Sequence, residues 1–226
     1  MSKIETKKRI KSFLNFIDNQ INSAVEELDR LADGHRVHLQ KLVYTNLVDR
    51  FDTLVDDLIK INSRNEMVLE KALKPLQQPI TEADLIRYLM DATDLSGVFD
   101  LKIEEGLHNT ILRERHSKKL QFLLSALKPD EHLKKPRVKR ATGEISDFEK
   151  IYDKSVPHSI PGYADYLYSR RNSLVHGAGE SKFLKRDKEQ INKLFEVKVT
   201  TSFRITYNAV PVAVRFYSDL AEMIMK

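Results

Sequence analysis

Residues 170–177 read RRNSLVHG and bring side chains suited to acid–base and phosphate chemistry into one short stretch. Histidine exchanges a proton near neutral pH, and arginine binds or stabilises the negative charge of a phosphate. The amide of Asn172 could orient a ring. Arg171, Asn172 and His176 together are a plausible set for handling a phosphodiester.

A helix across this stretch would divide its side chains between two faces, because each residue advances about 100° around the axis. One face collects apolar residues and predicts a buried stripe: Tyr163, Tyr166, Leu167 and Leu174. Asn172 and His176, four residues apart, lie on the opposite face, with Arg171 on the flank. Arg170 falls near the middle of the apolar stripe. We expect it to be a structural arginine paired with a carboxylate, with residues 49–56 as the candidate source.

The surrounding sequence favours an all-α fold. Seven glycines and seven prolines among 226 residues are few for the many turns of a β-sandwich or barrel. From Ile10 to Leu31, apolar residues recur in alternating steps of four and three. This predicts a long helix over residues 4–32, within an N-terminal segment 1–34 that Gly34 closes in a left-handed conformation. Because the stripe spans only about three heptads, packing within the chain is favoured over a dimeric coiled coil.

Further elements are predicted along the rest of the chain. Helices are expected over residues 37–61, 81–90, 107–128, 146–154, 162–176, 182–194 and 212–225. Residues 93–105 are predicted to form a loop, and residues 196–207 a small β-hairpin near the C-terminus. The acidic stripe of the 37–61 helix is expected to face solvent: Asp49, Asp52 and Asp56. We expect a single helical domain over residues 1–226.

The composition excludes several kinds of site. The chain has no cysteine, which excludes disulfides, thiolate zinc sites and a cysteine nucleophile. It lacks a glycine-rich phosphate loop and a serine-elbow motif. His35 and His38 are three residues apart but have no third ligand, so neither a metal nor a cofactor is predicted. Without an apolar signal segment or a run of about 18 apolar residues, we expect a cytoplasmic protein without a membrane segment.

A basic segment, residues 129–146, lacks helical periodicity and is predicted to be an exposed loop. The candidate RNA-binding cations are Lys134, Lys135, Arg137, Lys139 and Arg140. Clustered cations release counterions from a nucleic acid, and the net charge of +5 mildly favours a polyanionic partner. The alternative is a solvated insertion without a binding role. Tyr168 lies near Asn172 on the helical wheel and could stack on an RNA base.

The motif RNSLVH, residues 171–176, resembles the signature of the HEPN (higher eukaryotes and prokaryotes nucleotide-binding) family. That signature is an arginine, a polar residue and, after a short spacer, a histidine, late in an all-α domain. Gly177 and the final amphipathic helix also resemble the family, and the similarity would cover residues 37–226. It implies a HEPN-like helical bundle with metal-independent endoribonuclease activity. His176 would act as general base or acid at the ribose 2′-hydroxyl, Arg171 would stabilise the phosphorane, and Asn172 would orient the site.

The same resemblance implies a homodimer in which both motif helices form one composite active site. RNA would be cut to a 2′,3′-cyclic phosphate and a 5′-hydroxyl. Many relatives act in bacterial antiviral defence, through abortive infection or toxin–antitoxin systems, which makes an antitoxin or regulatory protein a candidate partner. Two alternatives stay open: a catalytically inactive HEPN-like module that binds a protein, nucleotide or RNA, and a helical RNA-binding protein that works through the basic loop. The N-terminal helix and the basic segment depart from a minimal HEPN domain and leave the choice of RNA open.

Overall fold

The computed structural model describes residues 2–28, 30–76, 81–90, 95–128, 138–146, 155–175, 182–199 and 205–226. Within these ranges the named elements are helical, which confirms the all-α class. The helices are α1 (Ser2–Phe16), α2 (Asn22–Leu28), α3 (Asp33–Ile61), α4 (Glu66–Leu73), α5 (Glu82–Met90), α6 (Leu95–Asn109), α7 (His116–Leu127), α8 (Ile160–Val175), α9 (Lys182–Phe195) and α10 (Ala209–Met225). A π-helical turn, Ile17–Ile21, joins α1 to α2, and a 3-10 turn, Lys74–Leu76, follows α4.

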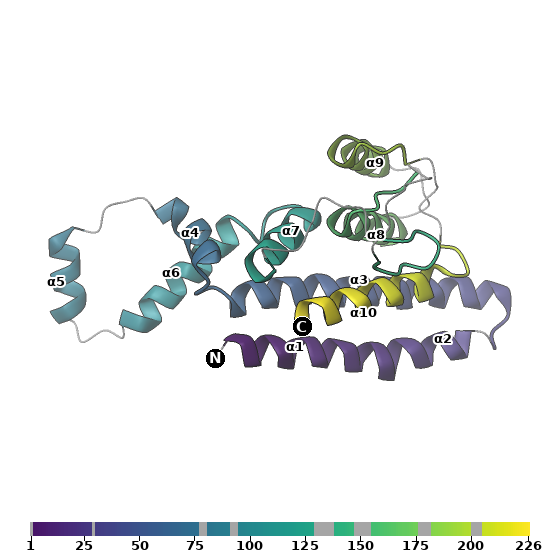
Figure 1. Ribbon diagram of the computed structural model, residues 1–226, viewed down its shortest axis with the longest axis horizontal. Coiled ribbons are helices and arrows are strands. Elements are labelled where there is room, and N and C mark those ends of the chain that lie inside the picture. Colours follow the sequence, from purple (N-terminus) through teal and green to yellow (C-terminus); the bar gives the residue numbers. More distant parts are fainter. Residues whose placement is uncertain are drawn as a thin grey trace.

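The three longest stretches of helix lie alongside one another (Figure 1). Helix α1 continues through the π-helical turn into α2, which confirms the predicted long N-terminal helix. Helix α1 packs against α3 and α10. The stripe of this helix is buried inside the chain at Ile10, Phe13, Ile17, Ile21 and Leu28. The apolar repeat is therefore used for intramolecular packing.

An aromatic cluster joins these three helices at the centre of the core. Phe51 of α3 is fully buried, and its ring stacks on Tyr217 of α10 with 4.3 Å between ring centroids. Phe13 of α1 meets Phe51 edge-on at 5.6 Å. Because aromatic pairs contribute beyond the area they bury, this cluster fixes the spacing of α1, α3 and α10.

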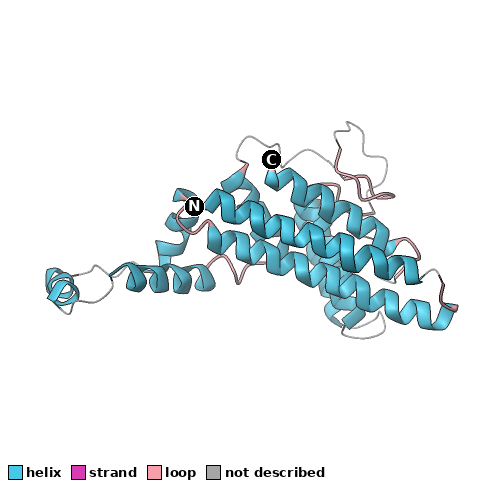
Figure 2. Ribbon diagram, turned by 90° about the horizontal axis from the view of Figure 1, so that it is seen from below, coloured by secondary structure: helices cyan, strands magenta, loops and turns pink. Residues whose placement is uncertain are grey.

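A second group of helices lies on the opposite side of α3 from α1 (Figure 1). Helices α7 and α8 pack on each other and on α3, and α9 packs on α8. Helices α4 and α6 pack together in an arm that extends beyond the end of α3, with α5 at its far end (Figures 1 and 2). Gly106 allows the close approach within this arm, because a Cβ there would overlap the backbone carbonyl of Ala72.

The predicted C-cap at Gly34 is wrong. Gly34 is the second residue of α3 and does not have a positive φ. The preceding chain turns at Arg30 and Leu31, and Ala32 has the extended conformation of a residue that precedes a helix. Asp33 then occupies the first turn of α3, where its charge complements the helix dipole.

The predictions between residues 62 and 128 need correction. Helix α4 was not predicted, although Asn65 caps it by accepting a hydrogen bond from the Met67 amide at 3.1 Å. The predicted loop 93–105 is largely helix α6, since Gly97, the one glycine of that range, costs only about 1 kcal/mol within a helix. The predicted helix 107–128 is interrupted: turns follow α6 from Thr110 onwards, and α7 begins at His116.

The predicted β-hairpin is not found in the parts of residues 196–207 that the structure describes, whereas residues 200–204 lie outside the described ranges. Residues 147–154 of the predicted helix 146–154 are also outside them. Strand-type pairing in the described ranges is limited to one isolated antiparallel bridge, between Val138 and Ile145.

We expect Phe51→Ala to lower the free energy of unfolding by about 3–5 kcal/mol, because it leaves a cavity where α1, α3 and α10 meet. Urea unfolding at neutral pH measures this loss. Phe99→Ala is the matched control, since Phe99 is 52% exposed on α6 and should lose only about 0.5 kcal/mol. Equal losses in the two variants would contradict the central role of Phe51.

Candidate functional site

Helix α8 carries the first five residues of the RNSLVH motif, whereas His176 lies outside the described residues. The predicted apolar stripe is confirmed in its first three members, since Tyr163, Tyr166 and Leu167 are buried. Leu174 is half-buried and packs against the core. The stripe thus fixes the rotation of α8 about its axis and determines where the next polar side chains emerge.

Arg171 is held by a carboxylate of α3. Its Nε lies 2.7 Å from Asp49 Oδ1, and Nη2 donates a hydrogen bond of 3.0 Å to Oδ2. Nη1 donates to Asn172 Oδ1 at 3.0 Å. The side chain of Arg171 is 22% exposed, so the guanidinium is fixed in position at the edge of the protein surface.

Arg170 does not form the expected ion pair within the described residues, because the α3 carboxylate pairs with Arg171 instead. Arg170 donates to the Tyr166 hydroxyl at 3.0 Å, and its guanidinium carbon lies 5.2 Å from the centroid of the same ring. A hydrogen bond also joins it to Tyr44. Aromatic hydroxyls and a ring face therefore surround this half-buried cation.

The prediction that the acidic stripe of α3 is merely solvated is wrong, because cations from α7 and α8 pack on it. Asp52 Oδ1 lies 2.6 Å from Nδ1 of His116 and 3.0 Å from Nζ of Lys119. Lys119 also contacts Asp56 Oδ1 at 2.6 Å, and only 7% of the lysine side chain is exposed. A nearly buried ammonium group requires such partners, so these carboxylates are needed where α7 meets α3.

These contacts change the acidity of Asp52. Burial alone would raise the pKa of this carboxyl, but the hydrogen bonds and positive charges of His116 and Lys119 outweigh burial and lower the pKa to about 2. Asp52 is therefore a fixed negative charge across the ordinary range of pH.

His116 was missed as a site residue from the sequence, where it appeared isolated. Its ring stacks on Tyr168 with 4.7 Å between centroids and 9° between ring planes. The guanidinium carbon of Arg171 lies 5.9 Å from the centroid of Tyr168. Tyr168 thus connects His116 to the motif arginine. This stacking uses ring surface within the chain, and base stacking by Tyr168 stays a prediction.

These contacts form a continuous series of side chains, Asp49–Arg171–Tyr168–His116–Asp52, that begins and ends on α3. Nε2 of His116 is buried and has no hydrogen-bond partner among the described residues. The helix break before α7 is what places this ring in the first turn of the helix. The available sequence signal was the run of seven polar residues, 113–119 (RERHSKK), which interrupts the apolar pattern of the predicted helix 107–128.

A cavity of about 420 Å³ lies beside this series of side chains, and Asn172 is among the residues that line it. Asn172 hydrogen-bonds Asp187 of α9, whose carboxyl has a pKa raised by burial. Arg115 pairs with the buried Asp165 at 2.7 Å and also hydrogen-bonds Gln190 of α9. Asn172 therefore links the motif arginine to α9, which is consistent with an orienting role.

The basic segment is only partly described. Lys134, Lys135 and Arg137 lie outside the described residues. Lys139 and Arg140 are exposed; Lys139 pairs with Glu144 at 2.9 Å, and Arg140 donates to Ser155 Oγ at 2.7 Å. The described part, residues 138–146, is attached to the body through Val138, whose amide donates to the His158 carbonyl at 3.0 Å.

Among the described residues, no group of three or more metal-ligating side chains is present. No helix in the described part of the chain is long and apolar enough to cross a bilayer. Comparison with models of known protein families, with curated proteins and with solved structures finds no match to this chain. The sequence motif and the contacts around it are therefore the features of this chain that bear on its function.

Asp52 predicts a specific pH dependence of stability. Because its pKa falls from an ordinary 3.8 to about 2 on folding, its stabilising effect is present above pH 3.8 and is lost as the pH falls toward 2. Wild type should lose about 2 kcal/mol more than Asp52→Asn between pH 5 and pH 2, measured by urea unfolding. Asp18→Asn, which removes an exposed carboxylate of the π-helical turn, should follow wild type. Parallel curves for wild type and Asp52→Asn would refute the prediction.

Proposed function

We propose that this protein is a metal-independent endoribonuclease that uses Arg171, Asn172 and His176, as its resemblance to the HEPN family implies. The observation that supports the proposal best is the fixed guanidinium of Arg171 at the protein surface, five residues before His176. Asp49 and Asn172 hold this side chain from two sides. A prepositioned cation of this kind can stabilise charge that develops on a phosphate.

The proposed reaction starts at the ribose 2′-hydroxyl. His176 removes its proton, and the oxygen attacks the adjacent phosphorus while Arg171 stabilises the additional negative charge of the phosphorane. The bond from phosphorus to the 5′-oxygen then breaks, and that oxygen takes up a proton from a general acid. The products are a 2′,3′-cyclic phosphate and a 5′-hydroxyl, with no net consumption of water.

The carboxylate of Asp49 has a positioning role in this proposal. Two contacts with a single carboxylate fix the plane of the guanidinium, and a guanidinium has five N–H donors in all. Donors therefore remain for phosphate oxygens. As the family resemblance implies, two copies of the chain would bring their motif helices together in a homodimer, with a role in bacterial defence and an antitoxin or regulatory protein as a further partner.

RNA cleavage in the presence of EDTA tests the proposal. Wild type should cut RNA to 2′,3′-cyclic phosphate ends, and both Arg171→Ala and His176→Ala should reduce the rate by at least about 100-fold, because each removes a group that acts in the transition state. Gel analysis of a labelled RNA measures rate and end chemistry together. Binding without cleavage by wild type would favour the inactive HEPN-like module instead.

Arg170→Ala is the matched control for Arg171→Ala, because the two arginines are adjacent on α8. Its side chain is enclosed by Tyr166 and Tyr44, so we expect a loss of about 1–3 kcal/mol in the free energy of unfolding. Where the variant is folded, cleavage should persist. Equal loss of cleavage in folded Arg170→Ala and Arg171→Ala would contradict the assignment of Arg171.

A further inference from the structure

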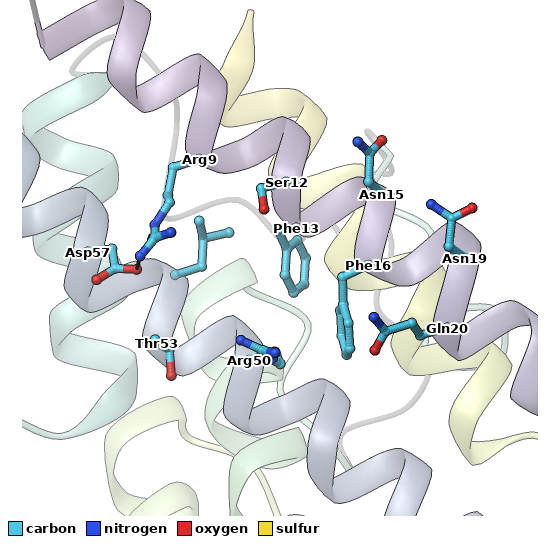
Figure 3. A pocket seen from close by; sticks show the side chains of 11 residues that line it. Arg9, Ser12, Phe13, Asn15, Phe16, Asn19, Gln20, Arg50, Thr53 and Asp57 are labelled. Atoms are coloured by element: carbon cyan, nitrogen blue, oxygen red, sulfur yellow. Dashed lines mark hydrogen bonds and ion pairs between the residues drawn. The ribbon is translucent and has the colours of Figure 1, made fainter.

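A groove of about 340 Å³ lies between α1 and α3, on the side of α3 that faces the N-terminal helix (Figure 3). Its sides carry hydroxyl, amide and guanidinium groups, and Phe13 and Phe16 supply aromatic surface. Arg9 and Arg50 are its cations, and Asp57 is its single carboxylate. A mixture of aromatic surface, neutral hydrogen-bonding groups and excess positive charge suits a nucleotide better than an apolar or cationic ligand.

The two arginines differ in their partners. Arg9 is tied to Asp57, with Nε at 2.8 Å and Nη2 at 2.7 Å from the same carboxylate oxygen. Arg50 is exposed, and its guanidinium carbon lies 5.3 Å from the ring centroid of Phe16. Among the residues that the structure describes, Arg50 has this ring contact but no ion pair. Its charge is therefore available to an anion.

Phe16 and Gln20 lie next to each other on one side of Arg50 in the groove (Figure 3). Phe16 is half-buried and ends α1, and Gln20 belongs to the π-helical turn that follows. Turns of this kind often occur at functional sites, because the extra residue displaces side chains from the regular helical positions. An aromatic ring, a guanidinium plane and an amide offer stacking surfaces and an edge-binding group for an unpaired RNA base.

The groove faces α1, and the motif helix α8 lies on the opposite side of α3, but the two sites are at the same level along α3. Arg50 directly follows Asp49, the carboxylate that holds Arg171. Thr53, which also lines the groove, donates from its hydroxyl to the Asp49 carbonyl at 3.0 Å. An RNA strand with a phosphate at Arg171 would therefore meet Arg50 as it crosses α3 toward α1.

We propose that this groove binds one unpaired nucleotide of a single-stranded RNA, flanking the cleaved bond. Its base lies against Phe16, Arg50 and Gln20, and a phosphate binds the Arg50 guanidinium. This inference rests on the proposed ribonuclease function and adds a binding position for the substrate. It gives the N-terminal helix, which departs from a minimal HEPN domain, a role in holding RNA.

Binding of a single-stranded RNA of about ten nucleotides, measured in a His176→Ala background so that RNA stays intact, tests the groove. Arg50→Gln and Phe16→Leu should each weaken binding about tenfold, by removing a phosphate contact and a stacking surface. Arg50→Gln should also lower the salt dependence by about 0.7 in the slope of log affinity against log salt, whereas Phe16→Leu should leave that slope unchanged. Because Arg50 is exposed, its variant should fold even if replacement of Phe16 disturbs packing.

Lys41→Gln is the matched control, since Lys41 is exposed on the same helix but does not line the groove. If Lys41→Gln and Arg50→Gln weaken RNA binding equally, the loss of affinity is explained by net charge alone and the proposal is overturned. So would a nucleoside monophosphate that binds as tightly as the longer RNA, because the groove would then be a site for free nucleotides.

Cleavage kinetics with RNAs of two lengths distinguish failure of the groove proposal from failure of the ribonuclease proposal. In cleavage-competent protein, Arg50→Gln should raise KM about tenfold for the longer RNA but leave KM for a dinucleotide unchanged, because the dinucleotide cannot reach the groove. Equal KM changes for both substrates would contradict a flanking position. If wild type cuts no RNA while Arg50→Gln still weakens its binding, the ribonuclease proposal fails and the RNA groove stands.

Discussion

The ion pairs between the aspartates of α3 and the cations of α7 and α8 constrain how these two helices pack on α3. Lys119 is almost completely buried and lies between Asp52 and Asp56, and Asp52 also holds His116. A buried ammonium group without these carboxylates would cost several kcal/mol, so α7 can approach α3 only in the register that pairs them. Asp49 does the same for α8 through Arg171. One acidic stripe thereby aligns two helices that carry the candidate site.

The same stripe connects stability to the proposed chemistry. Asp49 and Asp52 are three residues apart, and each holds a group that contacts Tyr168. A displacement of α7 would therefore move His116 and the Tyr168 ring stacked on it, and so change the position of Arg171 without any change in the motif sequence. This arrangement gives Arg171 a defined orientation before any substrate is bound, which is the condition under which electrostatic stabilisation of a transition state is most effective.

The N-terminal helix serves both the core and the surface. Phe13 joins the aromatic cluster with Phe51, while Phe16, one turn further along, borders the groove beside Arg50. The π-helical turn that follows lets the buried stripe continue at Ile17 and Ile21 while polar side chains remain beside the groove. In the proposed function, α3 separates two surfaces that act on one RNA strand: the motif on α8 and the groove against α1.

The amino-acid sequence is sufficient to predict the helical class, the long N-terminal helix and the buried face of α8, because these follow from the spacing of apolar residues along a single element. It also placed Arg170 on the apolar side of α8, but it did not identify the aromatic partners of this arginine. Three contacts are visible only in the folded chain: Asp49 pairs with Arg171, Asp52 pairs with the nearly buried Lys119, and His116 stacks on Tyr168. Those contacts join residues more than fifty positions apart, and the helix break before His116 is governed by packing rather than by local propensity. The charge pattern of α3 suggested a solvated face because sequence periodicity records which residues are polar, whereas burial depends on the cations that other helices bring to them.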